Sequence, residues 1–219
     1  LHIIGHLPRL RRFTVTGLPG SPETTNTRVL LESMARYRND LGLEILELTH
    51  IEFRSSFEVQ LLADLLGSHG GALTKLSLKG LIPVINDDMA GFLDPILHAM
   101  NSSSGASYLL PSYFELSGGD GVSVSGVSLI SEAALCRFLP CVDFSARNQW
   151  ALFLKGLGLD DSHAKLTAEL LPTVNARTVQ GKSASLSLNF QSNPAIGLPG
   201  YEALAQLLNR FWWTTPTGQ

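Results

Sequence analysis

The pattern L-x-x-L-x-L occurs in its clearest form at Leu43-Glu44-Ile45-Leu46-Glu47-Leu48 and Leu73-Thr74-Lys75-Leu76-Ser77-Leu78. In each copy another apolar residue follows three positions later, at Ile51 and Leu81. Alternate side chains of an extended segment point to opposite faces, so each copy predicts a strand with one apolar face.

Related segments return along the chain. Aligned on their second and third apolar positions, six copies share apolar pairs at Phe13/Val15, Leu46/Leu48, Leu76/Leu78, Phe114/Leu116, Leu152/Leu154 and Leu188/Phe190. The second apolar positions are 33, 30, 38, 38 and 36 residues apart. Two of the copies also share an identical segment of four residues: Leu78-Lys79-Gly80-Leu81 returns as Leu154-Lys155-Gly156-Leu157. A period of a few tens of residues indicates stacked strand–helix units rather than one globular core.

Each predicted strand is followed by a polar or Gly/Pro break and then by apolar residues at helical spacing. Three sets are predicted to face inward: Met89, Phe92, Leu93, Ile96, Leu97 and Met100; Phe57, Leu61, Leu62, Leu65 and Leu66; Tyr201, Leu204, Ala205 and Leu208. Because proline interrupts a helix, Pro95 predicts either a kink or a restart with Asp94 as the cap.

We therefore predict an α/β solenoid of about six repeats that forms a single domain over residues 1–219. The approximate repeats are 9–42, 43–72, 73–108, 109–148, 149–184 and 185–219. Residues 1–8 are expected to be the tail of a preceding repeat, which would make the chain part of a longer array. Phe211-Trp212-Trp213 is expected to cap the last repeat, with a partner-binding aromatic patch as the alternative.

The last repeat resembles a leucine-rich repeat of the ribonuclease-inhibitor type. Residues 188–197 read L-N-F-Q-S-N-P-A-I-G and residues 200–208 read G-Y-E-A-L-A-Q-L-L. Here Asn193 matches the family's asparagine that bonds backbone groups where the strand turns into the loop. The resemblance implies a horseshoe with parallel strands on the concave side and helices on the convex side. It also implies macromolecular binding, with no enzymatic activity in the repeats themselves.

Composition and charge narrow the classes of partner. The chain is 44% hydrophobic and 16% charged, which is typical of an ordered protein with a core. Its net charge is −3, and it has no basic stretch richer than Arg9-Arg11-Arg12, so no nucleic-acid partner is expected. No apolar run reaches the roughly 18–20 residues that span a bilayer, so no membrane interaction is expected either.

Two cysteines, Cys136 and Cys141, are expected to be buried free thiols, with a disulfide or half a metal site as the alternatives. Such low cysteine use favours a reducing compartment, and we expect a cytoplasmic, intracellular location.

Motifs for catalysis or cofactor binding are not evident. There is no Gly-x-Ser-x-Gly elbow, no phosphate-binding loop with a following Lys, and no dinucleotide fingerprint. Asp160-Asp161-Ser162-His163 is the densest polar cluster; a helix N-terminus is the preferred interpretation and a metal site the alternative. We expect no catalytic residues, no metal and no cofactor.

The candidate binding surface is the concave face of the predicted strands. Its residues alternate with the apolar core positions: Arg12, Thr14, Ile45, Glu47, Lys75, Ser77, Lys79, Tyr113, Glu115, Phe153, Lys155 and Asn189. Parallel stacking would place Thr14, Glu47, Ser77, Glu115, Phe153 and Asn189 in one row. Two aromatics among polar groups are typical of protein-binding hot spots, although a polar solenoid face with two incidental rings is an equally weighted alternative.

The preferred function is a non-catalytic scaffold, a monomeric solenoid that binds a protein partner through this face. The alternative is the recognition arm of a larger enzyme or nucleotide-regulated receptor whose catalytic domain lies outside this chain. A purely structural spacer is a third hypothesis. The identity of the partner does not follow from the residues.

Overall fold

A computed structural model describes residues 10–17, 27–36, 42–53, 55–69, 73–83, 89–102, 110–119, 127–142, 149–171 and 185–213. The strands are β1 (Arg12–Thr16), β2 (Ile45–Thr49), β3 (Glu52–Phe53), β4 (Lys75–Pro83), β5 (Tyr113–Gly118), β6 (Gln149–Lys155) and β7 (Ser185–Asn189). The helices are α1 (Thr27–Arg36), α2 (Ser56–His69), α3 (Asp94–Ser102), α4 (Glu132–Phe138), α5 (Asp161–Leu170) and α6 (Leu198–Trp213), with a short 3₁₀ helix, η4 (Leu139–Cys141), after α4.

Six strands form one parallel sheet in chain order, β1-β2-β4-β5-β6-β7, while the short β3 pairs only with β4. The register aligns Phe13, Leu46, Leu76, Phe114, Leu152 and Leu188 across the sheet. This is the alignment that the sequence repeats predict, so the strand positions and their mutual register are confirmed.

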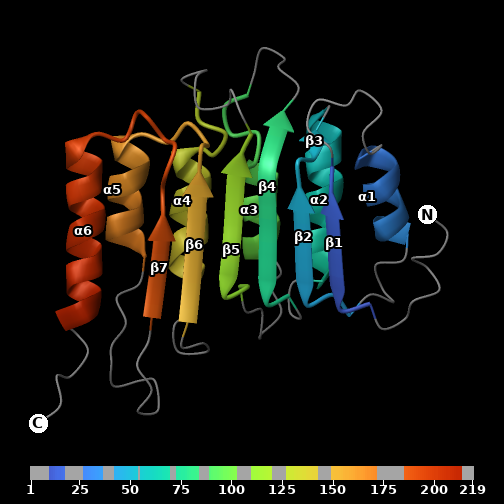
Figure 1. Cartoon of the computed structure of the whole chain (residues 1–219), viewed down its shortest axis with the longest axis horizontal. Coiled ribbons are helices and arrows are strands. Elements are labelled where there is room, and N and C mark those ends of the chain that lie inside the picture. Colours follow the sequence, from blue (N-terminus) through green and yellow to red (C-terminus); the bar gives the residue numbers. More distant parts are fainter. Residues whose placement is uncertain are drawn as a thin grey trace, which may run out of the picture.

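The helices form a second layer on one face of the sheet, seen behind the strands in Figure 1. Apolar strand residues point into the space between the two layers and are almost fully buried, as at Leu46, Leu76 and Leu116. Burying one leucine in this way stabilises the fold by about 1.5–3 kcal/mol. The architecture is therefore α/β, with helices on one side and a row of alternate, mostly polar side chains on the other, which we call the open face.

A left-handed backbone position recurs where the strands end. Gly80 and Gly156 both have φ +59°, and the register places His50 and Ser192, with φ 53° and 61°, at the same position of their own units. Glycine adopts this conformation without steric cost, whereas a residue with a Cβ is strained there. The identical segment at residues 78–81 and 154–157 thus reflects a turn that four units share.

Three expectations about individual residues are resolved by the helices. The helix α3 begins at Asp94, directly before Pro95, so the predicted restart is confirmed. Phe57 and Tyr201 were expected to face inward and are instead 50% and 48% exposed. Ala205 is exposed as well. The other residues predicted to face inward on these two helices are buried or partly buried, as at Leu62 and Leu204, so the predicted faces are correct and their margins are not.

The cysteine prediction is half right. Cys136 and Cys141 are both free, but both are exposed rather than buried. Cys136 lies on the outward side of α4, and Cys141 lies at the end of η4, where its thiol donates to Asn101 Oδ1 at 2.7 Å.

None of the described helices is long and apolar enough to cross a bilayer. The predicted tail at residues 1–8 and the side chains of Phe211, Trp212 and Trp213 lie outside the part of the chain that the structure describes in detail.

Candidate functional site: the open face of the sheet

The open face presents the row of residues that the repeats predict. Adjacent strands pair Thr14 with Glu47, Glu47 with Ser77, and Ser77 with Glu115, and the row continues through Phe153 to Asn189. The row is therefore confirmed as a geometric feature of the sheet.

Glu47 is the centre of a first polar group on this face. Its Oε2 accepts a hydrogen bond from Arg12 Nη2 at 2.9 Å and another from Thr14 Oγ1 at 3.0 Å, and its Oε1 lies 2.5 Å from Lys75 Nζ. Hydrogen bonds from Lys75 and Arg12 lower the pKa of Glu47 to about 2. Glu47 is thus a fixed negative charge that joins β2 to the strands on both of its sides.

Glu115 on β5 is the centre of a second and more buried group. Its Oε2 accepts from Tyr113 Oη at 2.7 Å and from Ser77 Oγ at 2.9 Å. Lys79 Nζ lies 3.3 Å from Oε2, and Lys155 Nζ lies 3.2 Å from Oε1. Burial alone would raise the pKa of Glu115, but the hydrogen bonds from Tyr113, Ser77 and Lys155 outweigh it and leave that pKa below its ordinary value.

Charge alternates from strand to strand across the face. The order is Arg12 on β1, Glu47 on β2, Lys75 and Lys79 on β4, Glu115 on β5 and Lys155 on β6. Both glutamates bind cations from the strand before and the strand after. We call these six residues the ion-pair row, which ties five strands together in register.

An aromatic pair lies beside the second group. The rings of Tyr113 and Phe153 are in T-shaped contact, with centroids 5.3 Å apart and planes at 79°. Lys75 Nζ lies 4.6 Å from the Tyr113 centroid, and Lys155 Nζ lies 5.1 Å from the Phe153 centroid, both within range of cation–π attraction. Burial and the bond to Glu115 raise the pKa of Tyr113 above its ordinary value, so the phenol stays a hydrogen-bond donor.

Two residues of the predicted surface are not available to a partner. Ser77 is 2% exposed and Glu115 is 1% exposed, because the longer side chains of the flanking strands cover the middle of the face. The sequence pattern distinguishes the two faces of a strand but not the depth of a side chain on one face. The remaining predicted residues are exposed or half-buried on the open face: Arg12, Thr14, Ile45, Glu47, Lys75, Lys79, Tyr113, Phe153, Lys155 and Asn189.

Asp160 caps the N-terminus of the helix α5, as the sequence predicts. Its Oδ1 accepts from the backbone N–H groups of Ser162 at 3.0 Å and His163 at 3.2 Å, and it lies 2.7 Å from His163 Nδ1. Burial would raise the pKa of Asp160, but these contacts with His163 lower it below the ordinary value. The arrangement is a capping box, which stabilises a helix N-terminus.

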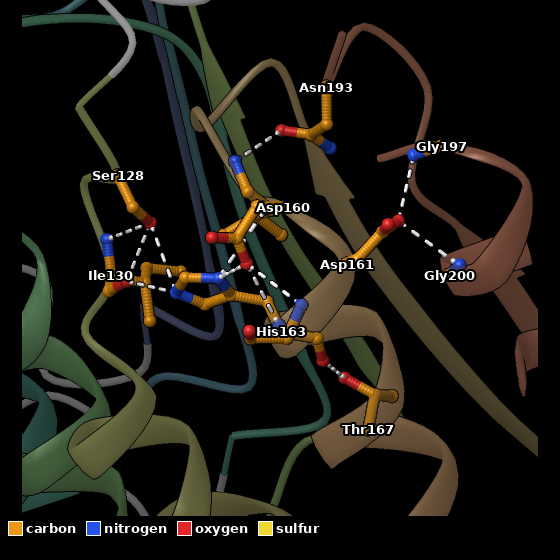
Figure 2. A network of polar contacts seen from close by, with 11 residues as sticks. Ser128, Ile130, Asp160, Asp161, His163, Thr167, Asn193, Gly197 and Gly200 are labelled. Carbon is orange, nitrogen blue, oxygen red and sulfur yellow. Dashed lines mark hydrogen bonds and ion pairs between the residues drawn. The ribbon is translucent and has the colours of Figure 1, made fainter. Parts of the chain in front are cut away.

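Together with Ser128, this cluster places a serine, a histidine and an aspartate side by side, as in a catalytic triad. The sequence does not reveal this arrangement, because Ser128 lies 35 residues before His163. Ser128 Oγ is 3.4 Å from His163 Nε2 (Figure 2). However, Nε2 is 2.9 Å from the carbonyl oxygen of Ile130, and Ser128 Oγ donates to that carbonyl at 2.6 Å. A carbonyl can only accept, so Nε2 carries a hydrogen and cannot take the proton of Ser128. The cluster therefore anchors the loop before α4 to the start of α5.

A metal would compete with these contacts. Glu132, Asp160 and His163 each offer one ligand atom, and the three atoms lie within 4.8 Å of one another. Both ring nitrogens of His163 already face oxygen partners, so coordination of a metal would displace either the helix cap or the bond to Ile130. The geometry thus favours the structural interpretation of this cluster.

Two further side chains labelled in Figure 2, Asn193 and Asp161, join the last two units. Asn193 is 2% exposed; its Oδ1 accepts from the backbone N–H groups of Leu157 and Leu159, and its Nδ2 donates to the carbonyl oxygens of Leu154 and Phe190. The predicted role of Asn193 at the strand-to-loop bend is confirmed. Asp161 Oδ1 accepts from Gly197 N at 2.8 Å and Gly200 N at 3.1 Å, which fixes the start of α6 against α5.

No protein-family model, curated protein or solved structure matches this chain.

Proposed function

We propose that the chain is a leucine-rich-repeat solenoid of the ribonuclease-inhibitor type, and that it is a non-catalytic scaffold that binds a protein partner through the open face. Three features support the first part. The parallel strands follow chain order, the helices form a separate layer, and the left-handed turn recurs at equivalent positions. Asn193 bonds the backbone of the preceding unit as the family's asparagine does.

The observation that carries the binding proposal is the aromatic pair of Tyr113 and Phe153. Both rings are only half-buried, although they lie in the middle of a sheet face rather than at its edge. Aromatic side chains in such a position supply a large contact area at a low cost in conformational entropy, and they dominate many protein interfaces.

Contacts within the chain hold both rings of the pair in place. Tyr113 is fixed through its hydroxyl to Glu115, and Phe153 is held by the Tyr113 ring and by the Lys155 ammonium group. A surface whose side chains are already ordered loses little conformational entropy on association, which favours a recognition function over that of a simple spacer.

We also infer an intracellular location for this scaffold. The two cysteines are exposed and free, 5 positions apart in the sequence, and neither is joined in a disulfide. Exposed thiols persist more readily in a reducing compartment than in an oxidising one.

The test is affinity capture from source lysate with quantitative mass spectrometry, comparing the wild-type chain with Tyr113→Ala/Phe153→Ala. The proposal predicts at least one protein that the wild type captures and the double variant loses. Phe57→Ala is the matched control, because Phe57 is an exposed aromatic residue on α2, in the helical layer. Like the rings of the pair it lies beside a cation, since Arg28 of α1 is 5.3 Å from its ring centroid. Equal thermal unfolding of all three chains shows that binding rather than folding has changed.

A partner that the double variant retains, or one that Phe57→Ala loses instead, would move the binding surface to the helical layer and refute this proposal.

A further inference from the structure

The open face has a different charge from the whole chain. Its ion-pair row contains four cations and two carboxylates, which gives a net charge of +2, whereas the complete sequence has a net charge of −3. The remaining residues of the chain therefore have a net charge of −5, so the ion-pair row is more positive than the rest of the chain.

The acidic and basic side chains of the ion-pair row also differ in their exposure to solvent. The side chains of Glu115 and Glu47 are 2% and 16% exposed, while those of Lys79 and Arg12 are 46% and 65% exposed. The carboxylates thus lie underneath, and a molecule that approaches the face meets the cations first.

The lysines keep hydrogen-bonding capacity after they bind the glutamates. An ammonium group has three donors, and Lys79 and Lys155 each use one of them on a different oxygen of Glu115. Glu115 therefore holds two ammonium groups of β4 and β6 on either side of the same carboxylate, close to the aromatic pair. The side chains of Lys79 and Lys155 are 46% and 29% exposed, so part of each remains open to solvent.

From this geometry we propose that the open face recognises an acidic protein segment, in which a carboxylate binds Lys79 and Lys155 and a neighbouring apolar side chain packs on Tyr113 and Phe153. This inference rests on the proposed function, since it specifies the chemistry of the partner at the same surface. Lys79 and Lys155 are the specificity residues, and Glu115 is a positioning residue that acts through them.

A nucleic acid fits the same face less well. A phosphate backbone places a negative charge at every nucleotide, and its binding is favoured by an uninterrupted row of cations. Glu47 lies between Arg12 and Lys75, at contact distance from both, so its negative charge interrupts the row of cations along which such a backbone would bind. A protein segment with one or two acidic side chains avoids this repulsion.

The probe for the test is a phage-displayed library of random linear peptides of about 12 residues. The library is selected on the wild-type chain and depleted on Tyr113→Ala/Phe153→Ala, so that only peptides that need the aromatic pair remain. We expect these peptides to be enriched in Asp or Glu next to apolar residues and to carry a net negative charge. Fluorescence anisotropy of the synthesised peptides should show affinity that falls about fivefold to tenfold in Lys79→Gln and again at high salt.

Matched variants separate charge from folding. Lys79→Arg keeps the charge and should restore most of the affinity, whereas Lys165→Gln, which removes an exposed cation from α5, should leave it unchanged. A thermal unfolding curve for each variant shows whether the loss of one lysine has loosened the buried Glu115.

The outcomes of this experiment distinguish a failure of the acidic-partner inference from a failure of the proposed binding function. Neutral or basic peptides that depend on the aromatic pair would overturn the acidic partner while leaving the binding face intact. The absence of any peptide that depends on the pair would overturn both. Tighter binding of a labelled 20-nucleotide single strand, with the same dependence on Lys79, would overturn the inference in favour of a nucleic acid.

Discussion

Lys155 of β6 places its ammonium nitrogen 3.2 Å from Oε1 of Glu115 on β5, a carboxylate that is almost completely buried beneath the open face. Ser77 and Lys79 of β4 bind the other carboxylate oxygen, so Glu115 joins three consecutive strands. The same group that orders the candidate binding surface therefore also stabilises the sheet.

Replacing Glu115 should reveal this double role. In Glu115→Ala the hydroxyls of Ser77 and Tyr113 lose their acceptor, and the two lysines lose their counter-charge, so we expect a loss of about 2–3 kcal/mol in the free energy of unfolding. In Glu47→Ala the bonding cations are more exposed, and we expect a loss of about 1 kcal/mol or less. Urea unfolding of both variants measures the difference, and equal losses would contradict the ranking by burial.

Acid should weaken the fold through Glu47. Its pKa is about 2 in the folded chain, against an ordinary value of 4.5, so on acidification the unfolded chain takes up this proton first. The stability that Glu47 contributes is complete above the ordinary pKa and is lost as the pH falls from about 5 toward 2. The lowered pKa values of Glu115 and Asp160 act in the same direction.

Urea unfolding of the wild type and Glu47→Gln between pH 7 and pH 2.5 tests this linkage. The difference in unfolding free energy between the two chains should shrink across the acidic range. A difference that stays constant down to pH 2.5 would show that the carboxylate of Glu47 is not stabilised by Arg12 and Lys75.

Asn193 should be one of the most sensitive polar residues. Asn193→Ala leaves two backbone N–H groups and two carbonyl oxygens without their side-chain partner in a buried bend, so we expect a loss of about 2–4 kcal/mol. Asn193→Asp should also destabilise the fold, because it removes the donors. Asn189→Ala is the control, since that half-buried side chain bonds to the nearby Gln191 and its loss should change stability little. Chemical denaturation of the three variants gives the comparison.

A substitution in the left-handed turn should stabilise the fold, unlike the substitutions above. Ser192 is exposed and has φ 61°, whereas the equivalent residue of the preceding unit is Gly156. Ser192→Gly should therefore stabilise the chain, by about 0.5–1 kcal/mol, because glycine removes the strain of the positive φ. Ser185→Gly, at an exposed strand position, should destabilise it slightly. A rise in the thermal midpoint for the first variant and a fall for the second would support the shared turn; a fall in both would contradict it.

Much of the fold follows from local sequence, because a period of two along a strand and a repeat of the whole unit are both visible in one dimension. The apolar pairs around Leu46 and Leu76 predict the strands, and their stacking predicts the register. The inward faces of the helices are predicted by the same apolar spacing, as at Leu62 and Leu204, but the margins are not: Phe57 and Tyr201 are exposed, because periodicity does not show where the covering layer ends.

The sequence predicts which residues lie on the open face, but it does not predict how deeply each side chain is buried. Alternation places Glu115 on the open face, but its burial depends on Lys79, Tyr113 and Lys155, which reach it from three strands. With the register known, opposite charges on adjacent strands provide a usable signal for such a cluster. No comparable signal marks the contact of Ser128 with His163, because it depends on the path of a loop.

The most direct test of binding at the open face is site-specific photo-crosslinking. A benzoylphenylalanine is introduced in place of Phe153 on β6 and, in a separate chain, in place of Phe57 on α2, and each chain is irradiated in source lysate. The proposed function predicts a discrete protein adduct from position 153 that competes with unlabelled wild-type chain, and none of that adduct from position 57. An adduct formed only from position 57 would contradict the account and place recognition on the helical layer.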